Sequence, residues 1–162
     1  MDRMMFSSKD QTWETPQELF DDLNDIFKFD LDVCADEDSA KCKVYFNEEQ
    51  DGLSQMWFGN CWMNPPYTRE QAKWVKKAIE EVNAGNAETV VVLIPARTET
   101  VAWQKYIFAE AKAICFVNGR LKFSGCSNAA PFPSAIVLFG SYLTKDEKVK
   151  LSKYGKVIGK AV

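Results

Sequence analysis

Residues 60–67 read NCWMNPPY, and this stretch decides how the rest of the chain can be arranged. A short apolar run ends there in two prolines, which stop a strand because proline has no backbone N–H to donate. Asn64 comes directly before Pro65 and is therefore restricted to an extended conformation. The sequence predicts a stiff turn at the end of a strand, carrying a side-chain amide and, at Tyr67, an aromatic ring.

The groups of this turn suit a flat base that carries an amino group. The amide oxygen of Asn64 and the backbone carbonyl of Pro65 can accept the two amino hydrogens, and the ring of Tyr67 can stack on the base. Without such a ligand, the same residues would form only a rigid turn between a strand and a helix. The candidate catalytic residues are Asn64, Pro65, Pro66 and Tyr67.

The length of 162 residues suits a single domain over residues 1–162. We expect a loose N-terminus over residues 1–11 and a C-terminal helix and tail over residues 144–162. No apolar run reaches the about eighteen residues of a membrane span, and the first ten residues lack the apolar core of a signal peptide. We therefore expect a cytoplasmic protein without a membrane partner.

Composition narrows the possible chemistry. The sequence contains no histidine and five cysteines, none of them paired at CxxC spacing, so we expect no metal site and no histidine-dependent nucleophile. Residues 1–60 hold 5 basic and 15 acidic side chains, whereas residues 61–162 hold 15 basic and 8 acidic side chains. A polyanionic partner would meet the second part of the chain, although ordinary solvated surface would also explain this distribution.

Patterns upstream of the turn indicate a helix, a strand and a second turn. Thr15 is a candidate N-cap, and Pro16 is at the first position of an amphipathic helix. Residues 29–35 begin with alternating apolar and polar side chains and predict a strand whose end carries Asp32. Asp51 and Gly52 form an Asp-Gly pair, one of the commonest turn sequences, and predict a turn. Ligands in open α/β sheets bind beyond the carboxyl ends of the strands, where Asp32 is expected.

Patterns downstream of the turn predict a βαβ unit. Thr68 can cap a helix that Gly85 ends. The apolar run over residues 89–94 is typical of a strand covered on both faces. Arg97 follows this strand, and we expect it at the same edge of the sheet as Asn64. Three further strands are predicted over residues 41–46, 113–117 and 135–139. A helix is predicted after Thr98 or Thr100, and another over residues 144–154. Residues 124–133 are predicted to form a loop. The sequence thus predicts one α/β domain with a mixed, mostly parallel sheet and helices on both faces.

The NPPY turn resembles the catalytic motif of amino-group methyltransferases that use S-adenosylmethionine. Residues 12–139 resemble the phage-type, Dam-like DNA adenine N(6)-methyltransferases. The resemblance implies a Rossmann-like methyltransferase fold and methyl transfer to the exocyclic amino group of adenine in DNA. It also implies S-adenosylmethionine as cofactor, DNA as partner, a monomer or homodimer and, for a phage-encoded enzyme, action in the bacterial host cell.

The resemblance also implies site residues outside the turn. In the family, a Trp-x-Thr-Pro segment and a strand ending in Asp-x-x-Ala lie near the amino-acid part of the cofactor, and an Asp-Gly-Leu segment borders its adenine or ribose. The cofactor-binding residues implied are Trp13, Thr15, Pro16, Asp32, Ala35 and Asp51. The usual glycine-rich cofactor loop is absent. The Pro-Ala-Arg and Gly-Arg-x-x-Phe segments imply DNA contacts from Arg97, Arg120 and Lys122.

Two alternatives stay open from the sequence. A similar NPPY turn serves enzymes that methylate glutamine side chains of proteins, but the Trp-x-Thr-Pro and Gly-Arg-x-x-Phe segments favour the DNA family. A catalytically inactive, DNA-binding relic of the fold is the second alternative, and weak or absent cofactor binding would favour it. The chain is short for a separate target-recognition domain, so sequence choice would come from loops such as residues 118–133 or from a dimer.

Overall fold

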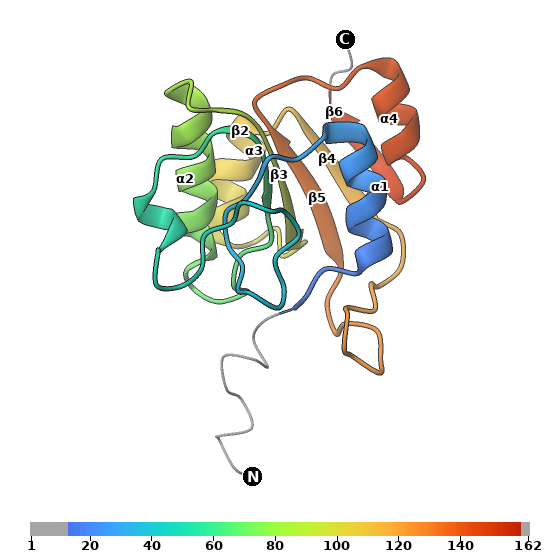
Figure 1. The fold of residues 1–162 in the computed structure, drawn as a ribbon. Coiled ribbons are helices and arrows are strands. Elements are labelled where there is room, and N and C mark those ends of the chain that lie inside the picture. The colour runs from blue at the N-terminus through green and yellow to red at the C-terminus, as the bar shows by residue number, and fades with distance from the viewer. Residues whose placement is uncertain (1–12, 160–162) are drawn as a thin grey trace.

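A six-stranded sheet forms the centre of the protein in the computed structural model, which describes residues 13–159 (Figure 1). The strands are β1 (Leu31–Asp32), β2 (Gly59–Met63), β3 (Ala87–Pro95), β4 (Ala113–Val117), β5 (Ser134–Phe139) and β6 (Gly155–Gly159). Their order across the sheet is β1-β2-β3-β5-β4-β6. β1 and β2, and likewise β2 and β3, pair in parallel, whereas the β3–β5, β4–β5 and β4–β6 pairs are antiparallel. β1 to β4 therefore share one direction, which confirms the predicted mixed, mostly parallel sheet.

Helices cover both faces of this sheet, as predicted (Figure 1). The helical segments are α1 (Gln17–Phe27), η3 (Gly52–Ser54), α2 (Gln71–Asn83), the π-helical η4 (Ala102–Ile107), α3 (Phe108–Glu110) and α4 (Lys145–Leu151). α2 and η4 pack through Trp74 and Trp103 onto one face, and α1 and α4 pack through Leu23 and Leu151 onto the other. β3 is buried between these layers along almost its whole length, which explains its continuous apolar sequence.

The central turn follows the predicted strand end. β2 ends at Met63, immediately before Asn64, and β2, α2 and β3 form the predicted unit of two parallel strands joined by a helix. α2 ends at Asn83, and Gly85 follows with a φ of 81°, a left-handed conformation that suits glycine after a helix. The carboxyl ends of β1, β2 and β3 therefore meet at one edge of the sheet.

The threonine caps predicted for α1 and α2 are wrong, and the helix expected after Thr98 or Thr100 begins at Ala102 as η4, with Val101 as its N-cap and no side-chain cap. α1 begins at Gln17 with Pro16 as its N-cap, and the Thr15 hydroxyl accepts a hydrogen bond from the Asn64 amide instead of from the helix. α2 begins at Gln71 with Glu70 as its N-cap, and the Thr68 hydroxyl accepts a hydrogen bond from the Glu70 N–H in the turn before the helix. Both helices start later than predicted.

The sheet also differs from the prediction at its edges. β1 is only two residues long, and residues 41–46 form no strand but a single bridge between Asp32 and Tyr45. Thr144 caps α4 with a capping box to Glu147, as its position suggests, but the predicted featureless tail contains the edge strand β6. The predicted loose N-terminus, residues 1–11, lies outside the described residues.

Residues 13–159 contain neither a candidate membrane-spanning helix nor a candidate metal site. None of the helices in this part of the chain has the length and apolar character needed to cross a membrane. The same residues contain no group of three or more histidine, cysteine or acidic side chains placed to hold a metal ion.

Candidate functional site

Two cavities border the turn that follows β2. Asn64, Pro65 and Pro66 line a first cavity of about 220 Å³, and Tyr67 lines a second cavity of about 800 Å³. Trp13 lines both cavities, so the N-terminal segment lies beside the turn where the two cavities approach each other. The turn predicted from the sequence thus contributes different residues to each of the two cavities, and Trp13 contributes to both.

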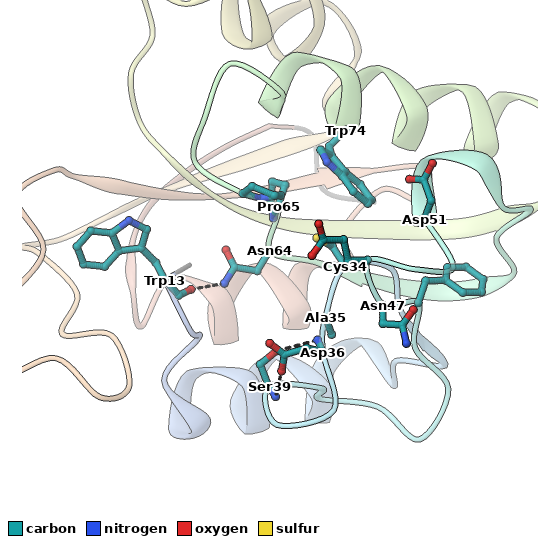
Figure 2. A pocket seen from close by; sticks show the side chains of 14 residues that line it. Trp13, Cys34, Ala35, Asp36, Ser39, Asn47, Asp51, Asn64, Pro65 and Trp74 are labelled. Carbon is teal, nitrogen blue, oxygen red and sulfur yellow. Dashed lines mark hydrogen bonds between the residues drawn. The ribbon is translucent and has the colours of Figure 1, made fainter. Parts of the chain in front are cut away.

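The first cavity has polar walls facing the turn. Its remaining lining residues are Trp13, Cys34, Ala35, Asp36, Ser39, Phe46, Asn47, Glu48, Asp51, Gly52 and Trp74. Figure 2 shows Trp13 on one side of the cavity and Asn47 and Asp51 on the opposite side, with Asp36 and Ser39 between them. Carboxylates and an amide on one wall can accept hydrogen bonds from hydroxyl and ammonium groups, while Trp74 offers an apolar surface.

The second cavity combines aromatic and basic groups. Besides Trp13 and Tyr67, its lining residues are Thr68, Arg69, Gln71, Ala72, Pro95, Arg97, Glu99, Thr100, Val101, Ala102, Pro131 and Phe132. The guanidinium carbon of Arg97 lies 5.7 Å from the centre of the Phe132 ring, within cation–π range. A flat aromatic ligand attached to a phosphate would meet complementary groups here.

The Asn64 amide has one satisfied end and one unsatisfied end. Its Nδ2 donates to the backbone carbonyl of Trp13 and to Thr15 Oγ1, the latter at 3.1 Å (Figure 2 shows the first of these bonds). Its Oδ1 is buried and has no hydrogen-bond partner among the described residues. A buried acceptor without a donor costs about 1–3 kcal/mol, so the unsatisfied Oδ1 is destabilising unless a group outside the described residues donates to it.

The Tyr67 ring is held by aromatic neighbours. It meets Phe123 and Phe132 edge to face, with ring centres 6.2 Å and 5.6 Å apart. Its hydroxyl donates to the carbonyl of Leu93 on β3 at 3.2 Å, and burial raises the pKa of Tyr67 well above its ordinary value. The phenol is therefore neutral and structural, and the ring is the part of Tyr67 that can serve a ligand.

Asp32 lines a smaller cavity together with Cys34, Ser39 and Asn64, which also line the first cavity. It is only 2% exposed, and its carboxylate accepts hydrogen bonds from the N–H groups of Cys34, at 3.3 Å, and Lys41, at 3.0 Å. Both bonds fix the loop that carries Ala35, Asp36 and Ser39 into the cavity wall. Burial raises the pKa of Asp32 from 3.8 to about 7, although the two backbone bonds oppose this shift.

The raised pKa of Asp32 predicts a dependence of stability on pH. The folded state binds the Asp32 proton more tightly than the unfolded state, so the contribution of Asp32 to the free energy of unfolding decreases as pH rises from about 4 to about 7. Asp32→Asn has no proton to lose and should show a smaller decrease over this range. Urea unfolding across the range measures the difference, with Asp38→Asn, an exposed residue of the same loop, as control. Equal pH slopes for wild type and Asp32→Asn would contradict this reading.

The structure brings most of the predicted site residues together. Trp13, Ala35 and Asp51 line the first cavity, and Arg97 lines the second. A smaller cavity of about 30 Å³ is lined by Glu14, Thr15, Asp32, Cys34, Ser39, Lys41, Trp62 and Asn64. Pro16 caps α1, so its contribution to the site is the placement of that helix.

Arg120 and Lys122 lie apart from the cavity walls. Both are exposed on the chain that follows β4, and β4 shares the direction of β3. They therefore emerge at the same sheet edge as Arg97 without lining either of the two larger cavities.

Several lining residues were not among the sequence candidates. Asn47 and Glu48 belong to a polar stretch without periodicity, and Trp74 is a buried residue of α2. Phe132 lies in the predicted loop over residues 124–133, and Thr100 lies between β3 and η4. The length of that loop at the ligand edge was the available signal for Phe132. The other residues depend on how distant segments pack.

Comparison with known proteins gives a consistent family match. A family model described as DNA N-6-adenine-methyltransferase (Dam) matches residues 3–151. A DNA N-6-adenine-methyltransferase of Escherichia phage T1 is 37% identical over 103 residues, which cover 62% of this chain and 40% of the relative. The DNA N-6-adenine-methyltransferase of Haemophilus phage HP1 (strain HP1c1) is 38% identical over 121 residues, which cover 72% of this chain and 68% of the relative.

The chain thus spans 40% of the length of the phage T1 relative and about two thirds of the length of the phage HP1 relative. Among solved structures, Thermoplasma acidophilum 1320 superposes with a TM-score of 0.42 at 10% sequence identity, covering 76% of this chain and 84% of that chain.

Proposed function

Because this chain belongs to the DNA N-6-adenine-methyltransferase (Dam) family, we propose that it transfers a methyl group from S-adenosylmethionine to the exocyclic amino group of adenine in DNA. The observation that carries the proposal is the Asn64 amide. Its Oδ1 is a buried acceptor without a partner among the described residues, and the turn that holds it borders both cavities. An amino group presented from the second cavity would supply the missing hydrogen.

The first cavity fits the cofactor by its donor and acceptor set. Ser39, Asn47 and the carboxylates of Asp36, Glu48 and Asp51 can accept hydrogen bonds from the ribose hydroxyls and the ammonium group. Asp32 would act through the loop that it fixes, because both of its oxygens already accept backbone hydrogens. When bound, S-adenosylmethionine supplies an electrophilic methyl group on a sulfonium.

The second cavity fits the target base. The amino group of adenine is inaccessible to in-line attack inside a duplex, so the base would be flipped out of the helix and stacked on Tyr67. Arg97 lies at this cavity beside Phe132 and would meet the phosphates on either side of the flipped nucleotide. The action of such an enzyme on DNA would be in the cytoplasm of a host cell.

The turn residues would raise the reactivity of the amino group. An aromatic amine is a poor nucleophile because its lone pair is delocalised into the ring. Asn64 Oδ1 and the Pro65 carbonyl would accept the two amino hydrogens, which favours a pyramidal nitrogen with a localised lone pair. Placement of that nitrogen in line with the methyl group would supply most of the rate enhancement. The nitrogen becomes strongly acidic on methylation, so no tuned general base is needed.

The basic side chains at the sheet edge predict a salt-dependent affinity for DNA. The equilibrium constant should fall with salt on a log–log plot, with a slope set by the number of phosphates neutralised. Arg97→Glu and Arg120→Glu should each weaken binding and make the slope shallower by about one contact. Fluorescence titrations over a series of salt concentrations measure both quantities. Lys145→Glu, an exposed change on α4, is the matched control. Binding independent of salt would argue against phosphate contacts.

A transfer assay tests the proposed activity and separates it from the alternatives. The protein is incubated with S-adenosylmethionine labelled in the methyl group, together with unmethylated DNA or with a protein extract. We expect label in DNA. Label in protein alone would favour the glutamine methyltransferase, and the absence of label together with no calorimetric binding of the cofactor at millimolar concentration would favour the inactive relic.

A further inference from the structure

The orientation of the Asn64 amide is set by two acceptors from a distant segment. Nδ2 carries two hydrogens, and the Trp13 carbonyl and Thr15 Oγ1 provide one acceptor for each. A rotation of the amide by half a turn would place Oδ1 against the Trp13 carbonyl, where two acceptors would repel each other. The amide therefore has one favourable orientation, and this orientation leaves Oδ1 as the end available to a ligand.

We propose that Thr15 and the Trp13 carbonyl are positioning groups, which hold Asn64 so that its Oδ1 accepts the hydrogen of the target amino group. The inference rests on the proposed function and concerns the same site. Thr15 is 2% exposed, its hydroxyl does not cap α1, and its Oγ1 accepts a hydrogen bond from the Asn64 amide. The buried Thr15 hydroxyl accepts a hydrogen bond from the Asn64 amide and none from α1, so its role is at the amide.

The segment that carries these groups is itself fixed from the other side. The Ser124 N–H donates to the Glu14 carbonyl at 3.0 Å, and the Ser124 hydroxyl donates to the Thr15 carbonyl at 3.2 Å. The Trp13 ring meets Phe123 and Phe132 edge to face, with ring centres 5.5 Å and 5.2 Å apart. Residues 13–15 are thus anchored before any ligand binds, as a preorganised site requires.

Two substitutions of Thr15 separate its hydroxyl from its shape. Thr15→Val keeps the size of the side chain and removes the hydroxyl, whereas Thr15→Ser keeps the hydroxyl. Thr15→Val should lower kcat by about threefold to tenfold, the effect of one neutral hydrogen bond, with the Kd for S-adenosylmethionine unchanged. Thr15→Ser should retain nearly the wild-type kcat. An increased Kd with an unchanged kcat would show that Thr15 contacts the cofactor and would overturn the inference, as would a wild-type kcat for Thr15→Val.

A double-mutant cycle tests whether Thr15 acts through Asn64. In an Asn64→Ala background, Thr15→Val should lower the single-turnover rate no further, because the amide that Thr15 orients is gone. An equal loss in both backgrounds would show that Thr15 acts independently of Asn64 and would contradict the proposal.

A spectroscopic measurement separates this inference from the proposed activity. The NMR signal of the ¹⁵N-labelled Asn64 side-chain amide should shift, and its hydrogens should exchange faster with solvent, in Thr15→Val but not in Thr15→Ser. If the wild type transfers no methyl group while the amide signals behave in this way, the proposed activity fails and the positioning of the amide stands. If the Asn64 signals are the same in all three proteins, the positioning role is wrong whatever the activity.

Discussion

Asn64→Ala is expected to lower kcat by about 100-fold or more while the Kd for S-adenosylmethionine changes little. The variant removes the buried Oδ1, an acceptor that would be needed mainly as the lone pair of the amino nitrogen localises in the transition state. Loss of one preorganised polar group of an oxyanion hole costs a comparable factor in other enzymes. A lower kcat at constant cofactor affinity is the kinetic sign of an interaction made in the transition state.

Two controls separate a catalytic effect of Asn64→Ala from a loss of stability and from a general effect of replacing an asparagine. Asn64→Ala also removes the two bonds that its amide makes to residues 13 and 15, so the melting temperature must be measured and the rates compared well below it. Asn83→Ala, an exposed asparagine at the end of α2, should have wild-type kinetics. Methyl transfer by Asn64→Ala at the wild-type rate would mean that the NPPY turn has only a structural role.

Substitutions of Tyr67 are expected to affect the capture of DNA. Tyr67→Ala removes the stacking surface, worth about 1–3 kcal/mol per base, and should raise KM for DNA by about fivefold to 150-fold. Tyr67→Phe keeps the ring and loses only the hydrogen bond to the Leu93 carbonyl, so it should retain most of the activity. Steady-state kinetics with DNA as the varied substrate give the expected order: wild type, then Tyr67→Phe, then Tyr67→Ala.

Tyr67→Leu is the matched control for packing. Leucine fills much of the volume against Phe123 and Phe132 but has no aromatic face. Compared with Tyr67→Ala, the leucine variant should therefore recover more of the stability than of the KM for DNA. If Tyr67→Leu binds and methylates DNA as well as Tyr67→Phe, the ring has no stacking role and acts only through packing.

The central turn could be predicted because its causes are local. Two prolines end a strand wherever they occur, and Asn64 is restricted by the residue next to it. The buried strand β3 could be predicted for a similar reason. Its apolar sequence alone predicts a strand covered on both faces, whichever helices cover it. These features gave the sheet edge on which the candidate site is found.

The partners of the turn could not be predicted, because they come from distant parts of the chain. Thr15 precedes the predicted helix at the position of a cap, yet its hydroxyl accepts a hydrogen bond from Asn64, which is 49 residues away. Asp32 lies at the predicted strand end, but the sequence does not indicate that both of its oxygens accept backbone hydrogens from the following loop. In each case the polar group had two possible partners, and tertiary packing selected one.

The short elements at the edges of the sheet could not be predicted correctly from sequence patterns. β6 has only one buried residue, Val157, between glycines at both ends, which is too little alternation to indicate a strand. Its pairing with β4 supplies the hydrogen bonds that define it. The reverse error occurred at residues 41–46, where an alternating pattern forms only a single bridge beside Asp32.

The most direct test of the account is the chemical identity of the methylated group. DNA incubated with the protein and S-adenosylmethionine is digested to nucleosides, and the products are identified by mass spectrometry, with Asn64→Ala as the matched control. The proposed function predicts N6-methyladenine, formed by the wild type and strongly reduced in the variant. Methylated cytosine as the product, or N6-methyladenine formed equally by both proteins, would contradict it.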